Sequence, residues 1–178
     1  MEPRLSKAVN DVIALSRKES LKYATGFIAS EHLVLALLIE IEVKKIADLV
    51  FKKLNLDTAK LSAILIDKIK KYGNGSKLKR SIPLTLEAER VLKISFTEAD
   101  SFGSEVVTTL HLLLAVFKEN KSNACIEVRD FNITYDTIKQ VINELILEET
   151  KELEPFIRQE PSRPLLYKLK GFLLRGSN

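Results

Sequence analysis

Two histidines, His32 and His111, are the side chains of this 178-residue chain best suited to proton transfer near neutral pH. Nucleophilic catalysis would need Cys125, the only cysteine, beside one of them together with an orienting partner. One cysteine and two histidines lying 79 residues apart offer no close set of zinc ligands. We therefore expect Cys125 to be a small buried apolar side chain, and the chain to have no catalytic residue, no metal and no cofactor. An enzyme using either histidine as a base is the remaining alternative, and no substrate is suggested for it.

Each histidine is the third residue of a repeated pattern. The first copy begins Ser30-Glu31-His32 and the second begins Thr109-Leu110-His111, and each leads into a run of apolar residues. Ser30 and Thr109 are predicted N-caps, because their hydroxyls can accept from backbone amides in the first turn of a helix. A histidine in such a turn is predicted to be structural, bonded to a carbonyl of its neighbour.

Glu31 is predicted to lie in the first turn of its helix, where the exposed amides and the helix dipole favour a negative charge. Two interpretations follow. The carboxylate is either a solvated charge at the helix start or a group presented to a cationic ligand. The second copy has Leu110 at this position, so the two copies cannot offer the same charge.

The histidine patterns belong to an internal duplication of a helical unit. Leu5, Val9, Val12 and Ile13 are spaced like one face of a helix and recur 79 residues later. We expect first helices over 5–23 and 84–101, short buried helices over 33–39 and 112–117, third helices over 43–54 and 121–131, and fourth helices that are capped by Asp57 and Thr134 and end near Lys71 and Thr150.

The predicted fold class is all-α, with two tandem four-helix repeats related by a pseudo-twofold axis. Repeat 1 is expected over 1–72 and repeat 2 over 84–150, joined by a basic linker, 73–83, that contains a Gly-Asn-Gly-Ser cluster. Residues 151–178 form a tail outside the repeat, which is expected to be a short helix or partly disordered.

The net charge of +4 is unevenly distributed. Five basic and no acidic residues lie in 70–83, whereas acidic residues exceed basic ones by six in 84–149. A nucleic-acid-binding protein more often places its positive charge on one face of a folded unit, so nucleic-acid binding is not expected. The longest apolar stretch, Leu33 to Ile39, is far shorter than the roughly 20 residues that cross a bilayer. With no signal segment and one cysteine, a cytoplasmic location without membrane contact is predicted.

These paired patterns resemble the Clp N-terminal repeat. The matching pieces are Leu5-Ser6 through Ile13, Ser30 through Leu38, Leu84-Thr85 through Leu92, and Thr109 through Phe117. The resemblance covers roughly residues 3–150, and its specificity comes from the pattern occurring twice in order. Ile82-Pro83-Leu84-Thr85, which opens the second copy, is similar to the ClpC type.

The resemblance implies a domain without chemistry of its own that recruits adaptors and substrates to a hexameric AAA+ unfoldase and its protease. It also implies pockets for phosphorylated arginine. Glu31 would accept the guanidinium, and Ser6 and Thr85 would lie near phosphate, whereas Leu110 implies that the second pocket is lost or altered. The isolated domain would be a monomer. The alternative is a freestanding accessory protein that binds a Clp ring or peptidase core.

Overall fold

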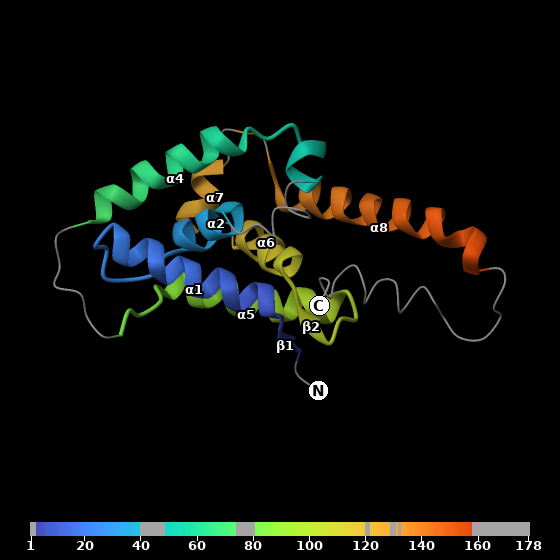
Figure 1. Cartoon of the computed structure of the whole chain (residues 1–178), viewed down its shortest axis with the longest axis horizontal. Helices are drawn as coiled ribbons and strands as arrows, with labels where there is room; N and C mark the ends of the chain where they lie inside the picture. The colour runs from blue at the N-terminus through green and yellow to red at the C-terminus, as the bar shows by residue number, and fades with distance from the viewer. Residues whose placement is uncertain are drawn as a thin grey trace.

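A computed structural model describes residues 3–39, 49–73, 81–119, 122–128, 131 and 133–157 of the chain (Figure 1). The described part of the first copy contains β1 Arg4–Leu5, α1 Lys7–Lys22, α2 Ser30–Ile39 and α4 Thr58–Tyr72. The described part of the second contains α5 Leu86–Ser101, β2 Val106–Val107, α6 Thr109–Lys118, α7 Asn123–Val128 and α8 Tyr135–Ile157. The all-α fold class is confirmed.

The centre of the fold is formed by α2 and α6. Both sequences are apolar around nearly the whole helix, so a stable helix there must be covered on all sides. Residues 30–38 and 109–117 are all buried. Figure 1 shows α1 and α5 on one side of this pair and α4 and α7 on the other. The prediction that these short helices form the core of each copy is confirmed.

Short extended segments of the two copies pair with each other. β1 pairs in parallel with β2, with Leu5 opposite Val107. An isolated parallel bridge joins Ile28 to Leu84. Adding the 79-residue offset to one pair gives the other, so the same contact is made twice with the roles of the copies reversed. This reciprocity is what a pseudo-twofold axis requires. Sequence patterning did not predict these strand pairs.

One backbone hydrogen bond repeats in the same way. The Ser6 amide donates to the Val107 carbonyl at 2.9 Å, and the Thr85 amide donates to the Ile28 carbonyl, also at 2.9 Å. Each bond joins the residue directly before the first helix of one copy to a residue two positions before the second helix of the other. The start of α5 is therefore held beside the start of α2, and the start of α1 beside the start of α6.

Most predicted helix boundaries agree with the structure, but two differ. Of the helix predicted over 121–131, the structure describes Asn123–Val128 as helical, and residues 121, 129 and 130 lie outside the described residues. The last helix, α8, continues to Ile157 rather than ending near Thr150, because glutamate, lysine and leucine, which favour helix, make up most of 148–154; it includes Pro155 near its end. In the first copy, a helical turn covers 49–53, and residues 43–48 of the predicted third helix lie outside the described residues.

Several predicted helix starts are found where expected. The Asp57 carboxylate accepts from the Lys60 amide at 2.9 Å, and the Thr134 hydroxyl accepts from the Thr137 amide at 3.2 Å. Parts of the linker predicted over 73–83 and of the tail predicted over 151–178 lie outside the described residues, so those domain boundaries remain predictions. None of the described helices has the length and apolar content that crossing a membrane requires.

Candidate functional site

The two histidines complete the starts of the central helices. His32 Nδ1 accepts from the Ala29 amide at 3.1 Å, and His111 Nδ1 accepts from the Thr108 amide at 3.0 Å. An N3 side chain that bonds the N-cap amide is half of a capping box, a place usually filled by glutamate or glutamine. Each histidine therefore accepts a hydrogen bond from a backbone amide that has no partner within the helix. The prediction that it bonds a carbonyl is wrong.

Both N-caps lie one residue earlier in the chain than predicted. The helices begin at Ser30 and Thr109, so the capping positions belong to Ala29 and Thr108. Ser30 and Thr109 were predicted as caps, and that assignment is wrong. The sequence argument chose the nearest hydroxyl before the apolar run and overlooked that the histidine side chain could do part of the capping.

Burial sets the charge state of the histidines. Both rings are fully buried, and desolvation lowers the pKa of each to about 4. In both rings Nδ1 accepts a hydrogen bond from a backbone amide, so each histidine is assigned as the neutral tautomer with its proton on Nε2. His32 Nε2 lies 3.3 Å from the Thr25 hydroxyl. Within the described part of the chain, His111 Nε2 has no hydrogen-bond partner.

Glu31 is fully buried and does not lie on the surface. Its Oε1 accepts from the Tyr72 hydroxyl at 2.7 Å, and its Oε2 accepts from the Ser30 hydroxyl at 3.2 Å. The interpretation of Glu31 as a solvated charge at a helix start is therefore wrong. The carboxylate instead belongs to a hydrogen-bonded cluster in which the end of α4 meets the start of α2.

This cluster continues into the second copy. The Ser30 hydroxyl accepts from the Ala124 amide at 3.3 Å, and the Asn123 side-chain amide donates to the Tyr72 hydroxyl at 3.3 Å. The Asn123 backbone amide also donates to Glu87 on α5, at 3.4 Å. We call Ser30, Glu31, Tyr72 and Asn123 the interface cluster. Its members come from α2, α4 and α7, so it joins the two repeats.

The structure places the two predicted phosphate-side hydroxyls beside different helices, Thr85 beside the start of α2 and Ser6 beside the start of α6. Thr85 caps α5, with its hydroxyl accepting from the Ala88 amide at 3.2 Å, and its own amide is bonded to Ile28, three residues before Glu31. Ser6 caps α1 in the same way and lies beside Val107. The 16-residue α1 is about 24 Å long and leads into the loop before α2, so Ser6 lies far from Glu31.

Each helix-start site is thus built from both repeats. The helix that begins with Ser30 and Glu31 starts beside Thr85, and the helix that begins with Thr109 and Leu110 starts beside Ser6. Leu110 is 6% exposed and apolar, so the second site offers no carboxylate where the first has Glu31. The two sites share a backbone frame but differ in charge.

A second buried carboxylate was missed from the sequence. Glu98 on α5 is fully buried, accepts from Lys118 Nζ at 2.6 Å and accepts from the Tyr135 hydroxyl at 3.0 Å. Its counterpart in the first copy, Glu19, is 7% exposed and pairs with Lys22 at 3.2 Å. The recurrence of a glutamate at the 79-residue offset, on the buried face of the first helix, is the signal that could have revealed both.

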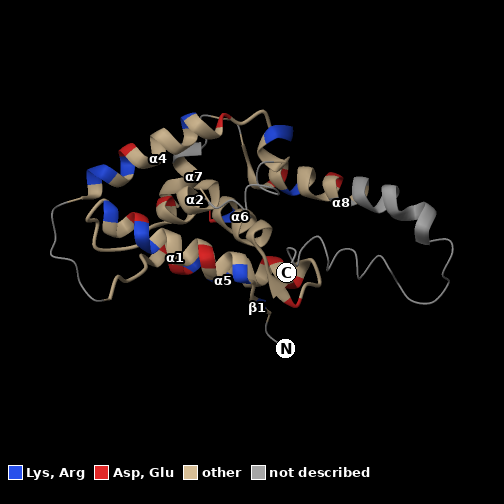
Figure 2. Ribbon diagram, viewed as in Figure 1, with Lys and Arg blue, Asp and Glu red and all other residues tan. Residues whose placement is uncertain are grey.

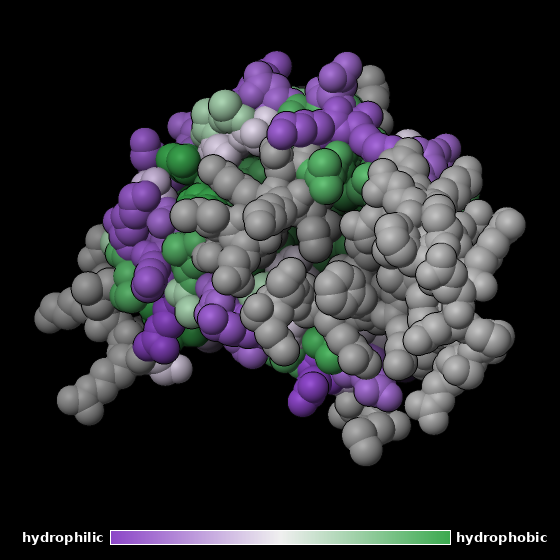
Figure 3. Space-filling model, turned by 45° about the vertical axis from the view of Figure 1, so that its right-hand side comes forward, coloured by the Kyte–Doolittle hydropathy of each residue, from purple (hydrophilic) through white to green (hydrophobic). Residues whose placement is uncertain are grey.

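The molecular surface shows charge and apolar groups away from these sites. Figure 2 shows lysines along α4, in agreement with six lysines and two aspartates in 49–73. In Figure 3, hydrophobic residues on the described part of one face form small groups among hydrophilic ones. Leu86 and Leu147 are the most exposed of the large apolar residues that the structure describes, at 72% and 56%.

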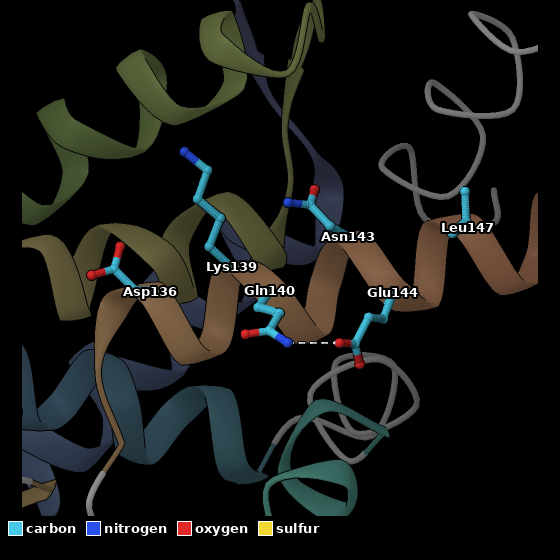
Figure 4. Close-up of a pocket in the computed structure, with 6 residues that line it drawn as sticks. All are labelled: Asp136, Lys139, Gln140, Asn143, Glu144 and Leu147. Carbon is cyan, nitrogen blue, oxygen red and sulfur yellow. Dashed lines mark hydrogen bonds between the residues drawn. The ribbon is translucent and has the colours of Figure 1, made fainter.

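A shallow depression of about 490 Å³ runs along α8 (Figure 4). All its lining residues come from that one helix, and Gln140 donates to Glu144 across it at 2.9 Å. It contains no residue of the interface cluster and none of the predicted ligand residues. The helix starts of α2 and α6 therefore remain the candidate sites.

Known proteins share this sequence pattern and fold. The profile of the Clp repeat (R) N-terminal domain matches residues 4–131. The negative regulator of genetic competence ClpC/MecB of Bacillus subtilis (strain 168) is 27% identical over 143 residues, which are 80% of this chain and 17% of that protein. The chloroplastic chaperone protein ClpC2 of Arabidopsis thaliana is 32% identical over 124 residues, which are 70% of this chain and 13% of that protein. The chain thus spans less than a fifth of the length of these relatives.

A solved structure shows the same fold. The Hsp104 N-terminal domain from Candida albicans superposes with a TM-score of 0.68 at 16% identity, covering 80% of this chain and 91% of that one. The profile match covers most of the chain and includes both helix-start sites. The chain therefore belongs to the Clp repeat N-terminal domain family.

Proposed function

We propose that this chain recruits adaptor and substrate proteins to a Clp-type unfoldase. Its fold supports this role because the helix starts of α2 and α6, which carry the predicted ligand residues, are each assembled from both repeats. Among the described residues, the hydroxyls of Thr25 and Thr108 lie 3.3 Å from His32 and His111, but these threonines and both histidines are buried, and the histidine rings cap helices. Binding rather than catalysis is the proposed activity.

The ligand class that we propose for the α2 site is a phosphorylated arginine side chain. The observation that carries this proposal is the 2.9 Å bond between the Thr85 amide and the Ile28 carbonyl, which holds a helix-capping hydroxyl beside the helix that bears Glu31. A carboxylate suits the planar guanidinium, and helix-start amides suit the phosphate group. Leu110 cannot accept from a guanidinium, so one equivalent per chain is proposed.

Calorimetric titration of the 178-residue chain with phosphoarginine tests this site. Arginine and inorganic phosphate are the ligand controls, and Glu31→Gln is the decisive variant. Glu98→Gln is the matched control, because Glu98 is equally buried and also accepts from a tyrosine hydroxyl. We expect saturable binding near one equivalent in the wild type and in Glu98→Gln, and at least about tenfold weaker binding in Glu31→Gln, as loss of a charge-assisted hydrogen bond predicts. Equal affinity of wild type and Glu31→Gln, or equal binding of arginine, would refute the assignment.

The freestanding accessory protein is the second proposal for the whole chain. In this role the chain would bind a Clp ring or peptidase core as an accessory subunit, with residues 151–178 as part of its contact surface. Continuation of the reading frame into a nucleotide-binding module would exclude it. Direct binding of the 178-residue chain to an assembled Clp ring would favour it.

A further inference from the structure

The interface cluster contains one residue that occupies the proposed ligand group. The Tyr72 hydroxyl donates to Glu31 Oε1 at 2.7 Å, the shortest hydrogen bond that Glu31 makes. The Tyr72 ring lies 5.7 Å from the Phe27 ring, which flanks the loop before α2. Tyr72 therefore covers the carboxylate oxygen that a guanidinium would have to reach.

Glu31 is poorly neutralised for a buried carboxylate. Its two donors are hydroxyls, and none of the lysines and arginines that the structure describes forms an ion pair with it. Glu98 is also fully buried and tyrosine-bonded, but it has Lys118 at 2.6 Å. Buried charges are ordinarily paired, because desolvating an unpaired charge is costly. Among the described residues, Glu31 thus has two hydroxyl donors and no cationic partner, and the Tyr72 hydroxyl takes the position that Lys118 has beside Glu98.

Tyr72 is also a contact between the repeats. It is the last residue of α4, and its hydroxyl accepts from the Asn123 side chain of α7 at 3.3 Å. The next residue, Gly73, leaves no room for a side chain, because an added Cβ would lie 2.4 Å from the Tyr23 carbonyl oxygen. The end of α4 is therefore packed tightly against the end of α1, and Tyr72 is held over Glu31.

We propose that Tyr72 is a latch that closes the α2 site and must release Glu31 before a cationic ligand binds there. Release breaks the Asn123–Tyr72 bond as well as the Tyr72–Glu31 bond, so ligand binding in repeat 1 loosens a contact with repeat 2. The latch is confined to one site, because the second copy has Leu110 in place of Glu31. The identity of the ligand rests on the proposed function, whereas the closure of Glu31 by Tyr72 does not.

Carboxylate labelling tests the latch without any ligand. The 178-residue chain is treated with a water-soluble carbodiimide and an amine, and modification of each carboxylate is followed by peptide mass spectrometry. Tyr72→Phe is expected to increase the labelling rate of Glu31 while leaving that of Glu98 unchanged. Tyr135→Phe, the matched control, is expected to leave the Glu31 rate unchanged. An unchanged Glu31 rate in Tyr72→Phe, or an equal increase in Tyr135→Phe, would overturn the latch.

Ligand affinity tests the gating. In calorimetry, Tyr72→Phe is expected to bind phosphoarginine about tenfold more tightly than the wild type, equivalent to about 1.4 kcal/mol, because no hydroxyl must be displaced. Weaker or equal binding would overturn the gate and make Tyr72 a ligand contact or a bystander. If no variant binds phosphoarginine while Glu31 labelling still responds to Tyr72→Phe, the proposed ligand fails and the latch stands.

A second variant covers the case in which Tyr72→Phe does not fold. Asn123→Ala keeps the tyrosine but removes its contact with repeat 2. It is expected to increase Glu31 labelling and phosphoarginine affinity in the same direction, by a smaller factor. Unchanged labelling of Glu31 in a folded Asn123→Ala chain would overturn the link between the latch and the repeat interface.

Discussion

Mild acid is expected to destabilise this domain through its two buried histidines. Burial lowers the pKa of His32 and of His111 from 6.5 to about 4. In the unfolded chain both recover their ordinary pKa, so the unfolded state binds more protons throughout that interval. Stability therefore falls as the pH falls below 6.5, and this contribution is fully lost once the pH reaches about 4.

The size of the stability loss follows from the difference between the pKa values in the folded and unfolded states. One pKa unit corresponds to about 1.4 kcal/mol, so each histidine costs about 2 kcal/mol at about pH 5 and up to about 3 kcal/mol in stronger acid. The loss has a structural cause as well. A protonated Nδ1 can no longer accept from the Ala29 or Thr108 amide, so the starts of both central helices lose a cap. Glu98 partly offsets the effect at His111, because its negative charge favours the protonated ring.

Proton NMR titration measures the two pKa values directly, since the chain contains only two histidines. Urea denaturation between about pH 7 and pH 5 then measures the loss of stability in the wild type and in the double variant His32→Gln/His111→Gln, which keeps an acceptor that does not titrate. The wild type is expected to lose about 4 kcal/mol more than the double variant over this range. Histidine signals titrating near their ordinary pKa, or equal losses in both proteins, would refute the account of capping by neutral rings.

Three further changes probe the core and its tight contacts. Leu35→Ala should lower the free energy of unfolding by about 2–5 kcal/mol, since Leu35 is fully buried in α2, and an unchanged melting temperature would contradict its place in the core. Gly73→Ala should cost about 1–3 kcal/mol in urea denaturation, because its Cβ would lie 2.4 Å from the Tyr23 carbonyl oxygen; a neutral result would mean that the end of α4 shifts easily. Glu98→Gln should cost about 1–3 kcal/mol, limited by the 44% exposure of the Lys118 side chain, and the loss should disappear in a Lys118→Met background if the ion pair is its cause.

Most of the fold could be predicted because hydrophobic periodicity and duplication agree. The stripe of Val9 and Val12 recurs as Ala88 and Val91, and all four are fully buried. The periodicity could not reveal the strand pairing between the two copies. A strand of two residues carries no detectable pattern, and pairing between segments about 100 residues apart depends on how the packed helices bring their ends together.

The candidate site was predicted only in part. The patterns around Glu31 and Thr85 identified the starts of α2 and α5, which the structure holds side by side. The burial of Glu31 was not foreseen, because a glutamate in the first turn of a helix is usually exposed and only the tertiary structure brings Tyr72 to it. Asn123 was missed for the same reason, since the stretch around it is the least similar between the two copies. Glu19 and Glu98 could have been found, because a repeated charge on an apolar stripe marks a buried partner.

Amide chemical-shift mapping with phosphoarginine tests the central claim, that the two helix-start sites share a frame but only one binds. The account predicts that signals from 28–31 and 84–86 move together during the titration, while those from 5–7 and 107–110 stay in place. Equal shifts at both sites would contradict the assigned difference between Glu31 and Leu110. Shifts confined to residues elsewhere would contradict the placement of the site itself.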